Sequence, residues 1–205
     1  MPRLIKAIIF DWGGVLVEDP IPRMIEHFSK ILQVEKEELV KALPECRPDF
    51  ERGTISEEVF WKRMCRSLSI PDRSMNSLWS HSFKNAYKEN REMFSLASSL
   101  RQNGYKIGLL SNTEVPAVEY FRERGYEIFD ATVFSCVEGM RKPEKGIYHV
   151  ALNKLGVQPE EAIFIDDKEA NVKGAERAGI NAILFRDPGQ VKRELSAFMV
   201  KTVSS

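Results

Sequence analysis

Five polar side chains of the sequence have the types needed to bind a divalent cation and a phosphoryl group side by side. Each ends or follows a short apolar run, and they are Asp11, Ser111, Lys142, Asp166 and Asp167. Carboxylates close to one another raise each other's pKa unless a cation joins them, and oxygen ligands suit Mg²⁺. A hydroxyl and a lysine add donors for an anion, and an aspartate can attack a phosphoryl group to give an aspartyl-phosphate. These residue types therefore predict Mg²⁺-dependent phosphoryl transfer.

The elements that must position these side chains are short buried strands. Five apolar runs are continuous rather than alternating, which is typical of strands covered on both faces in a parallel sheet. The runs span residues 5–10, 106–111, 131–135, 162–166 and 181–185. Helical patterns follow at residues 91–104, 115–125, 145–156 and 169–179. This alternation predicts an α/β fold, a three-layer Rossmann-like sandwich with a central parallel sheet.

The candidate residues fall at one edge of that predicted sheet. In open parallel sheets, ligands bind beyond the carboxyl ends of the strands. Asp11 ends the first run, Ser111-Asn-Thr ends the second, GMRKPE (139–144) follows the third, and Asp166-Asp167 ends the fourth, with Asn171 one turn later. Each motif alone is weak evidence, because strand-end serines and acidic pairs often only cap the next helix. Their shared edge favours a site.

Residues 17–89 break the alternation, since they contain helical patterns and no strand run. Apolar residues line one face of 21–32, a capping box from Thr54 to Glu57 opens 54–68, and 77–87 is helical. We expect a helical cap inserted after the first strand, either as a lid or as a plain subdomain. The predicted division is a core of 1–16 and 90–205 with a cap of 17–89.

Composition narrows the class of protein. The 205 residues carry 30 basic and 30 acidic side chains, which gives no support for nucleic-acid or membrane partners. Three cysteines show no disulfide or zinc spacing, and the first 14 residues lack the features of a signal peptide. We expect a cytoplasmic enzyme with a small phosphorylated substrate; the oligomeric state is left open.

The order of the motifs resembles the haloacid dehalogenase (HAD) superfamily. The order of motifs along the chain is the one typical of that family: Asp11-Trp-Gly-Gly-Val-Leu, Ser111-Asn-Thr, Lys142-Pro and Asp166-Asp167. The helical insertion also lies where the family places its cap. FERGTISEEVFWKRM (50–64) and GMRKPEKGIYHVALNKLGVQPEEAIFIDD (139–167) resemble a narrower subgroup. It contains bacterial sugar-phosphate (glucose-1-phosphate) phosphatases and the N-terminal phosphatase domain of soluble epoxide hydrolases.

The resemblance implies a role for each residue. Asp11 is the nucleophile and a Mg²⁺ ligand, with the Gly13 carbonyl and Asp167 as the other protein ligands. The residues beside the metal ligands are Asp166 and Asn171. The residues implied in phosphate binding are Gly13, Gly14, Ser111, Asn112 and Lys142, and Ser111 and Lys142 also count as catalytic.

One position departs from the family pattern. Phosphatases of this family usually carry a second Asp two residues after the nucleophile, where this sequence has Gly13. Loss of that general acid costs about 10²–10⁴ in rate unless another group replaces it, and the candidates are Glu18, Asp19 or a residue of the cap. We also expect the glycines to bring the Gly13 carbonyl to the metal, where a side chain would obstruct it.

Three alternatives to a phosphatase remain open from the sequence. They are a metal-independent haloacid dehalogenase, a phosphonate hydrolase, and a non-catalytic relative that binds a phosphorylated ligand. The substrate itself is not readable from the cap, where Phe50, Arg52 and Trp61 either line the mouth of the site or pack the cap.

Overall fold

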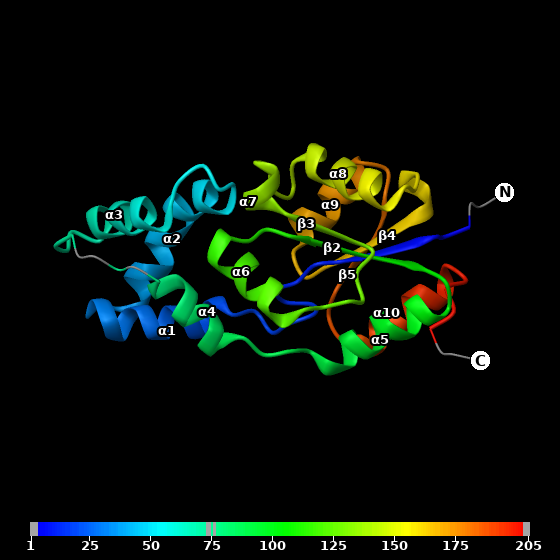
Figure 1. Ribbon diagram of the computed structural model, residues 1–205, viewed down its shortest axis with the longest axis horizontal. Helices are drawn as coiled ribbons and strands as arrows, with labels where there is room; N and C mark the ends of the chain where they lie inside the picture. Colours follow the sequence, from blue (N-terminus) through cyan, green and yellow to red (C-terminus); the bar gives the residue numbers. More distant parts are fainter. Residues whose placement is uncertain (1–3, 73–74, 76, 203–205) are drawn as a thin grey trace.

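The computed structural model describes residues 4–72, 75 and 77–202. Its centre is a parallel five-stranded sheet in the order β3-β2-β1-β4-β5 (Figure 1). The strands are β1 (Ala7–Phe10), β2 (Lys106–Ser111), β3 (Ala131–Phe134), β4 (Ala162–Asp166) and β5 (Asn181–Leu184). All five predicted strands are therefore confirmed, three of them one or two residues shorter than expected.

Helices cover both faces of the sheet. Alternation along β1 sends Ile8 and Phe10 into one core and Ala7 and Ile9 into the other, because successive strand side chains point to opposite faces. The first face is covered by α5 (Arg91–Gln102), α6 (Val115–Arg124) and α10 (Pro188–Ala197). The second is covered by α8 (Lys145–Leu155) and α9 (Glu169–Arg177), with the short α7 (Ser135–Glu138) following β3. The three-layer prediction is confirmed.

Four further helices lie beyond one end of the sheet, on the side to which β1 runs (Figure 1). They are α1 (Ile21–Leu32), α2 (Lys36–Glu51), α3 (Glu57–Ser67) and α4 (Leu78–Ala86). Their own core is aromatic, with Phe60 stacked on Phe50 at 4.8 Å and edge-on to Trp61 and Trp79 at 5.0 and 5.2 Å. Such pairs add to the energy of apolar burial. None of the described helices combines the length and apolar character that a membrane span requires.

The start of α3 differs from the prediction. Ser56, not Thr54, is the N-cap, and its hydroxyl accepts from the Val59 N–H at 3.3 Å. The Thr54 hydroxyl instead donates to the Asp49 carbonyl at 2.9 Å. Glu57 accepts from the backbone N–H of Trp79, in α4, at 2.8 Å. The prediction of a capping box was wrong, because the Glu57 carboxylate that would complete the box accepts a hydrogen bond from α4 instead.

The two segments that join the four helices to the sheet lie side by side. Val17 and Glu89 form an antiparallel bridge. The Glu18 N–H donates to the Lys88 carbonyl and the Asn90 N–H donates to the Leu16 carbonyl, each at 2.9 Å. This paired double connection supports our proposed division into a core of 1–16 and 90–205 and a cap of 17–89.

Candidate active site

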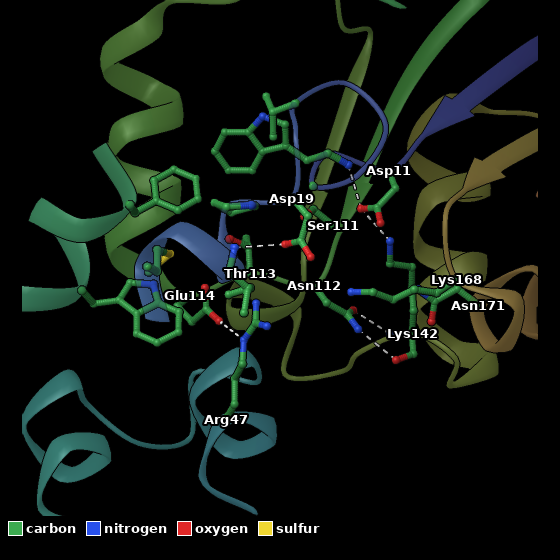
Figure 2. Close-up of a pocket in the computed structure, with 18 residues that line it drawn as sticks. Asp11, Asp19, Arg47, Ser111, Asn112, Thr113, Glu114, Lys142, Lys168 and Asn171 are labelled. Atoms are coloured by element: carbon green, nitrogen blue, oxygen red, sulfur yellow. Dashed lines mark hydrogen bonds and ion pairs between the residues drawn. The ribbon is translucent and has the colours of Figure 1, made fainter. Parts of the chain in front are cut away.

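The sheet order explains why distant motifs meet. β1 lies between β2 and β4, with Phe10 in register with Leu109 and Ile165. Residues at the carboxyl ends of these strands line a cavity of about 40 Å³, together with residues of α1, α2 and α4 (Figure 2). The sequence-predicted residues that line it are Asp11, Gly13, Ser111, Asn112, Lys142 and Asn171. The other three do not line it: Asp166 contacts Lys142, and Gly14 lies against the Asp167 carboxyl.

Lys142 is the centre of the buried charges. Its ammonium lies 2.8 Å from Asp11 Oδ1 and 2.7 Å from Asp166 Oδ2, and it donates to the Leu110 carbonyl at 2.9 Å. Asn112 holds the lysine in place, since its side-chain amide donates to the Lys142 carbonyl at 2.9 Å and accepts from the Lys142 N–H at 2.8 Å. The Asn112 side chain is therefore engaged, and its backbone N–H is the group that can face a phosphoryl oxygen.

Asp11 and Asp166 share the Lys142 ammonium, yet their pKa values shift in opposite directions. Burial and the charge of Asp166 raise the pKa of Asp11 to about 8, although Lys142 acts in the opposite direction. Burial also opposes ionisation of Asp166, but its hydrogen bonds and charge contact with Lys142 outweigh that and lower its pKa. The Lys142 pKa is raised by the two carboxylates in spite of burial. Asp11 is thus the carboxylate with the greater need of a further cation.

Two of the three carboxylates in the acidic cluster, those of Asp11 and Asp167, are suited to bind a divalent cation. Oxygens of Asp11, Asp166 and Asp167 lie within 4.8 Å of one another. Asp166 is saturated by Lys142, by the Lys168 N–H at 2.8 Å and by the Asn171 amide at 3.0 and 3.1 Å. Asp167 Oδ1 is buried and has no donor among the described residues, and burial raises the Asp167 pKa. Hard, unpartnered oxygens of this kind suit Mg²⁺.

In the turn after Asp11, the glycine that leaves no space for a side chain is Gly14 rather than Gly13. Gly14 has φ +89°, and a Cβ built there would lie 2.5 Å from the Asp167 carboxyl. A Cβ at Gly13 would make only an ordinary contact, 3.6 Å from Pro20 Cδ, so the turn itself has room for a small side chain there. That a side chain at Gly13 would obstruct the metal stays a prediction. Trp12 and Gly14, rather than Gly13, bond to Val17, which leaves the Gly13 carbonyl available to a metal.

This difference predicts opposite outcomes for two alanine substitutions. Gly14→Ala forces a Cβ into the Asp167 carboxyl, and we expect Mg²⁺ affinity to fall about 10–100-fold. Gly13→Ala has ordinary contacts and is the matched control, with affinity expected within about threefold of wild type. Isothermal titration with Mg²⁺ measures both. Equal losses in the two variants would contradict the assignment of Asp167 as a ligand.

Sequence reasoning missed the residues that the cap and the neighbouring loops bring to the cavity. They are Arg47, Trp79, Thr113, Glu114 and Lys168, none of which carries a local signal of its role. The three residues that the sequence suggested for the mouth of the site do not line the cavity. Phe50 and Trp61 pack the cap core, and Arg52 pairs with Glu144 at 2.6 Å. The sequence could not separate the cap residues among them, because Arg47 and Trp79 are the same residue types as Arg52 and Trp61 and fall in the same predicted cap.

The two acids considered as replacements for the missing general acid are also separated. Glu18 is exposed and pairs with Arg23 at 2.8 Å and Lys88 at 2.5 Å. Asp19 lines the cavity, and Figure 2 shows its carboxylate among the pocket residues between Asp11 and Glu114. Of the two, only Asp19 lines the cavity; it is exposed, as Glu18 is, and its Oδ1 accepts from the Ile21 N–H at 3.1 Å.

Comparison with known proteins places this fold and site in one family. A family model for haloacid dehalogenase-like hydrolases matches residues 5–179. The chain belongs to this family, which confirms the resemblance drawn from its motifs, and the protein is a hydrolase. A HAD family enzyme from Bacteroides thetaiotaomicron, solved with magnesium and inorganic phosphate, is 26% identical, with a TM-score of 0.73 over 89% of this chain and 94% of that one.

Curated relatives include both longer proteins and one of similar size. Acyl-CoA dehydrogenase family member 10 of Mus musculus is 32% identical over 96% of this chain, and bifunctional epoxide hydrolase 2 of Rattus norvegicus is 27% identical over 93%. The chain spans only 19% and 38% of these two proteins. Glyceraldehyde 3-phosphate phosphatase of Methanopyrus kandleri is 33% identical over 89% of this chain and 84% of its own length.

Proposed function

We propose that the protein is a Mg²⁺-dependent phosphatase that hydrolyses a small phosphorylated metabolite through an aspartyl-phosphate on Asp11. The observation that carries the proposal is the pairing of Asp11, at the cavity wall, with the unpartnered buried oxygen of Asp167. The relative described above, solved with magnesium and inorganic phosphate, supports a site that takes both groups. Bound to Asp11, Asp167 and the Gly13 carbonyl, Mg²⁺ supplies positive charge for the phosphoryl oxygens.

The residues of this chain divide the work of the reaction. Asp11 Oδ1 accepts from the Trp12 N–H at 2.7 Å and from Lys142, so the carboxylate is held in one orientation for attack on phosphorus. The Ser111 hydroxyl and the backbone N–H groups beside it bind the phosphoryl oxygens. Lys142 offsets the negative charge that develops on them, which is the larger catalytic contribution in such reactions.

The leaving oxygen still requires a proton, and Gly13 has no side chain to give it. We assign this role to Asp19, the acid that lines the cavity. After transfer, the same carboxylate is placed to accept a proton from the water that hydrolyses the aspartyl-phosphate. A metal-independent dehalogenase accounts less well for the site, because it has no use for the unpartnered Asp167 oxygen.

The proposed reaction is tested by phosphate release from a panel of sugar phosphates, triose phosphates, nucleotides and p-nitrophenyl phosphate. We expect release in Mg²⁺ and at least a 100-fold loss in EDTA, since the cation supplies positive charge beside the phosphoryl oxygens. Activity that survives EDTA would contradict metal dependence. Absence of phosphate release from every ester, together with halide release from a haloacid, would replace the phosphatase by a dehalogenase.

The role of Asp19 is tested with Asp19→Asn and the neighbouring control Glu18→Gln. For sugar phosphates, whose leaving groups are poor, we expect Asp19→Asn to lower kcat about 100-fold. For p-nitrophenyl phosphate, whose leaving group needs little protonation, the loss is expected to stay within about threefold. Glu18→Gln should leave both rates unchanged, because Glu18 pairs outside the cavity. Equal losses on both substrates would rule out proton donation.

A further inference from the structure

The two ends of the cavity differ in charge. At the sheet end, Lys142 and Lys168 accompany Asp11, which suits a phosphoryl group. At the cap end, the polar lining comes from Thr113 and Glu114 in the loop after β2 and from Arg47 of α2, with Trp79 of α4 beside them. The proposed reaction uses none of these cap-end groups, although the leaving group of any phosphate ester must lie against them.

Arg47 presents free donors at this end. Its Nε lies 2.8 Å from Glu114 Oε1 and 3.1 Å from Glu51 Oε1, and its side chain is 21% exposed. No hydrogen bond joins its two terminal nitrogens to the described residues. Figure 2 shows the guanidinium directed into the cavity, beside Glu114 and below Asp19. The forked end of the side chain therefore faces the space that a leaving group would occupy.

The surrounding charges leave no surplus for a second anion. Arg47 faces Glu51 and Glu114, and Arg141 adds one further cation, 2.6 Å from Glu51 Oε2. Burial lowers the Arg47 pKa, but the charges of Glu114, Glu51 and Asp19 outweigh it, so the guanidinium stays charged. Burial raises the pKa of Glu114, although Arg47 opposes the shift. Even with Glu114 neutral, Glu51 and Asp19 balance Arg47 and Arg141, so no unbalanced cation remains to bind a carboxylate or second phosphate of the substrate. A hydroxyl, in contrast, can accept from the guanidinium and donate to a carboxylate.

The remaining wall of the cap end is apolar. Trp79 and Phe83 of α4 and Met24 of α1 line it, and the Trp79 ring lies 5.7 Å from Arg47 Cζ. Trp79 Nε1 is buried and has no hydrogen-bond partner among the described residues. Apolar rings beside polar donors and acceptors match the two faces of a polyol, with its C–H groups and its hydroxyls. The small cavity volume, about 40 Å³, favours a compact alcohol over a nucleoside.

We propose that the cap end is a leaving-group subsite for a neutral, hydroxylated alcohol, a short polyol or a sugar, and that Arg47 is its specificity-determining residue. The proposal rests on the proposed phosphatase function and specifies its substrate class. It predicts that monophosphates of neutral polyols are preferred over phosphate esters that carry a second acidic group.

The test uses Arg47→Lys, which keeps a cation near Glu114 and Glu51 but removes the forked donors. We expect KM for glycerol phosphate and glucose 6-phosphate to rise about 10–100-fold, as when a hydrogen bond to a charged group is lost. Phenyl phosphate, which has no hydroxyl, should change less than about threefold. Arg52→Lys is the matched control, because Arg52 also joins the cap to a core glutamate but does not line the cavity. The wild type should prefer glycerol phosphate over 3-phosphoglycerate at least tenfold.

A binding measurement separates failure of this proposal from failure of the phosphatase. Glycerol phosphate and inorganic phosphate are titrated into Asp11→Asn and into Asp11→Asn/Arg47→Lys, with Mg²⁺ present. Weaker binding of glycerol phosphate alone in the double variant supports the subsite even if no ester is hydrolysed. The subsite is overturned if both ligands weaken equally, if neither weakens, or if neither binds. A wild-type preference for 3-phosphoglycerate would also overturn it.

Discussion

Asp11→Asn is expected to lower phosphate release by about 10⁴-fold or more, because it removes the nucleophile while keeping its size. The same change should stabilise the metal-free fold by about 1–3 kcal/mol at neutral pH and above. Asp11 is buried beside Asp166, and Lys142 is the only cation in contact with either among the described residues. With Asn at position 11, Lys142 and Asp166 form a neutral pair, and the cost of a second buried carboxylate is gone.

The stability effect has a defined dependence on pH. Burial raises the pKa of Asp11 from 3.8 to about 8, so the folded metal-free protein holds this proton more tightly than the unfolded chain. Stability from this group is complete below pH 3.8 and is lost as the pH rises toward 8. Asparagine does not titrate, so the advantage of Asp11→Asn should grow between these two values.

Thermal unfolding in EDTA at pH 5, 6.5 and 8 measures this advantage, with about 2–4 °C expected per kcal/mol. Added Mg²⁺ should narrow the gap, because the cation compensates the Asp11 charge of the wild type. Asp11→Asn with an unchanged melting temperature at all three pH values would contradict the electrostatic account of the site. Retained phosphate release would contradict Asp11 as nucleophile.

Lys142→Met is expected to destabilise the fold by about 3–5 kcal/mol, the cost of leaving buried charges without their partner. The ammonium is 1% exposed and is shared by Asp11 and Asp166, so its removal strands two carboxylates at once. Activity should be lost as well, because both the orientation of Asp11 and the charge offset depend on the lysine. The loss of stability should be smaller at low pH, because protonation neutralises one of the two unpaired carboxylates.

Chemical denaturation at pH 5 and 8 tests the stability effect. Lys173→Met is the control, because Lys173 pairs with Glu169 in an exposed i,i+4 contact with 59% and 67% of the side chains accessible. An exposed pair of this kind contributes less than about 1 kcal/mol. Similar losses in the two variants would show that the buried lysine is not what holds the carboxylates together. The double variant Lys142→Met/Asp166→Asn should recover part of the stability, which a purely steric defect would not allow.

The sequence by itself determined the sheet, four of the core helices (α5, α6, α8 and α9) and the family. Continuous apolar runs such as Lys106–Ser111 and glycine-terminated helices such as Lys145–Leu155 are local signals, and the structure reproduces them to within two residues. The sequence patterns did not predict where α2 and α10 begin and end. In α2, Pro44 and Pro48 contradict the helical pattern, and packing of the helix in the cap outweighs that local preference.

Only the tertiary structure decided how the site residues differ from one another. Asp166 and Asp167 are adjacent in sequence, yet the first is saturated by Lys142 and Asn171 and the second keeps an unpartnered oxygen. Arg47 reaches the cavity through a contact with Glu114, 67 residues away. Hydrogen-bond saturation and cap–core contacts depend on which distant groups meet in space. Residue types and spacing therefore predict the chemistry of this edge, whereas the roles of individual side chains follow only from the fold.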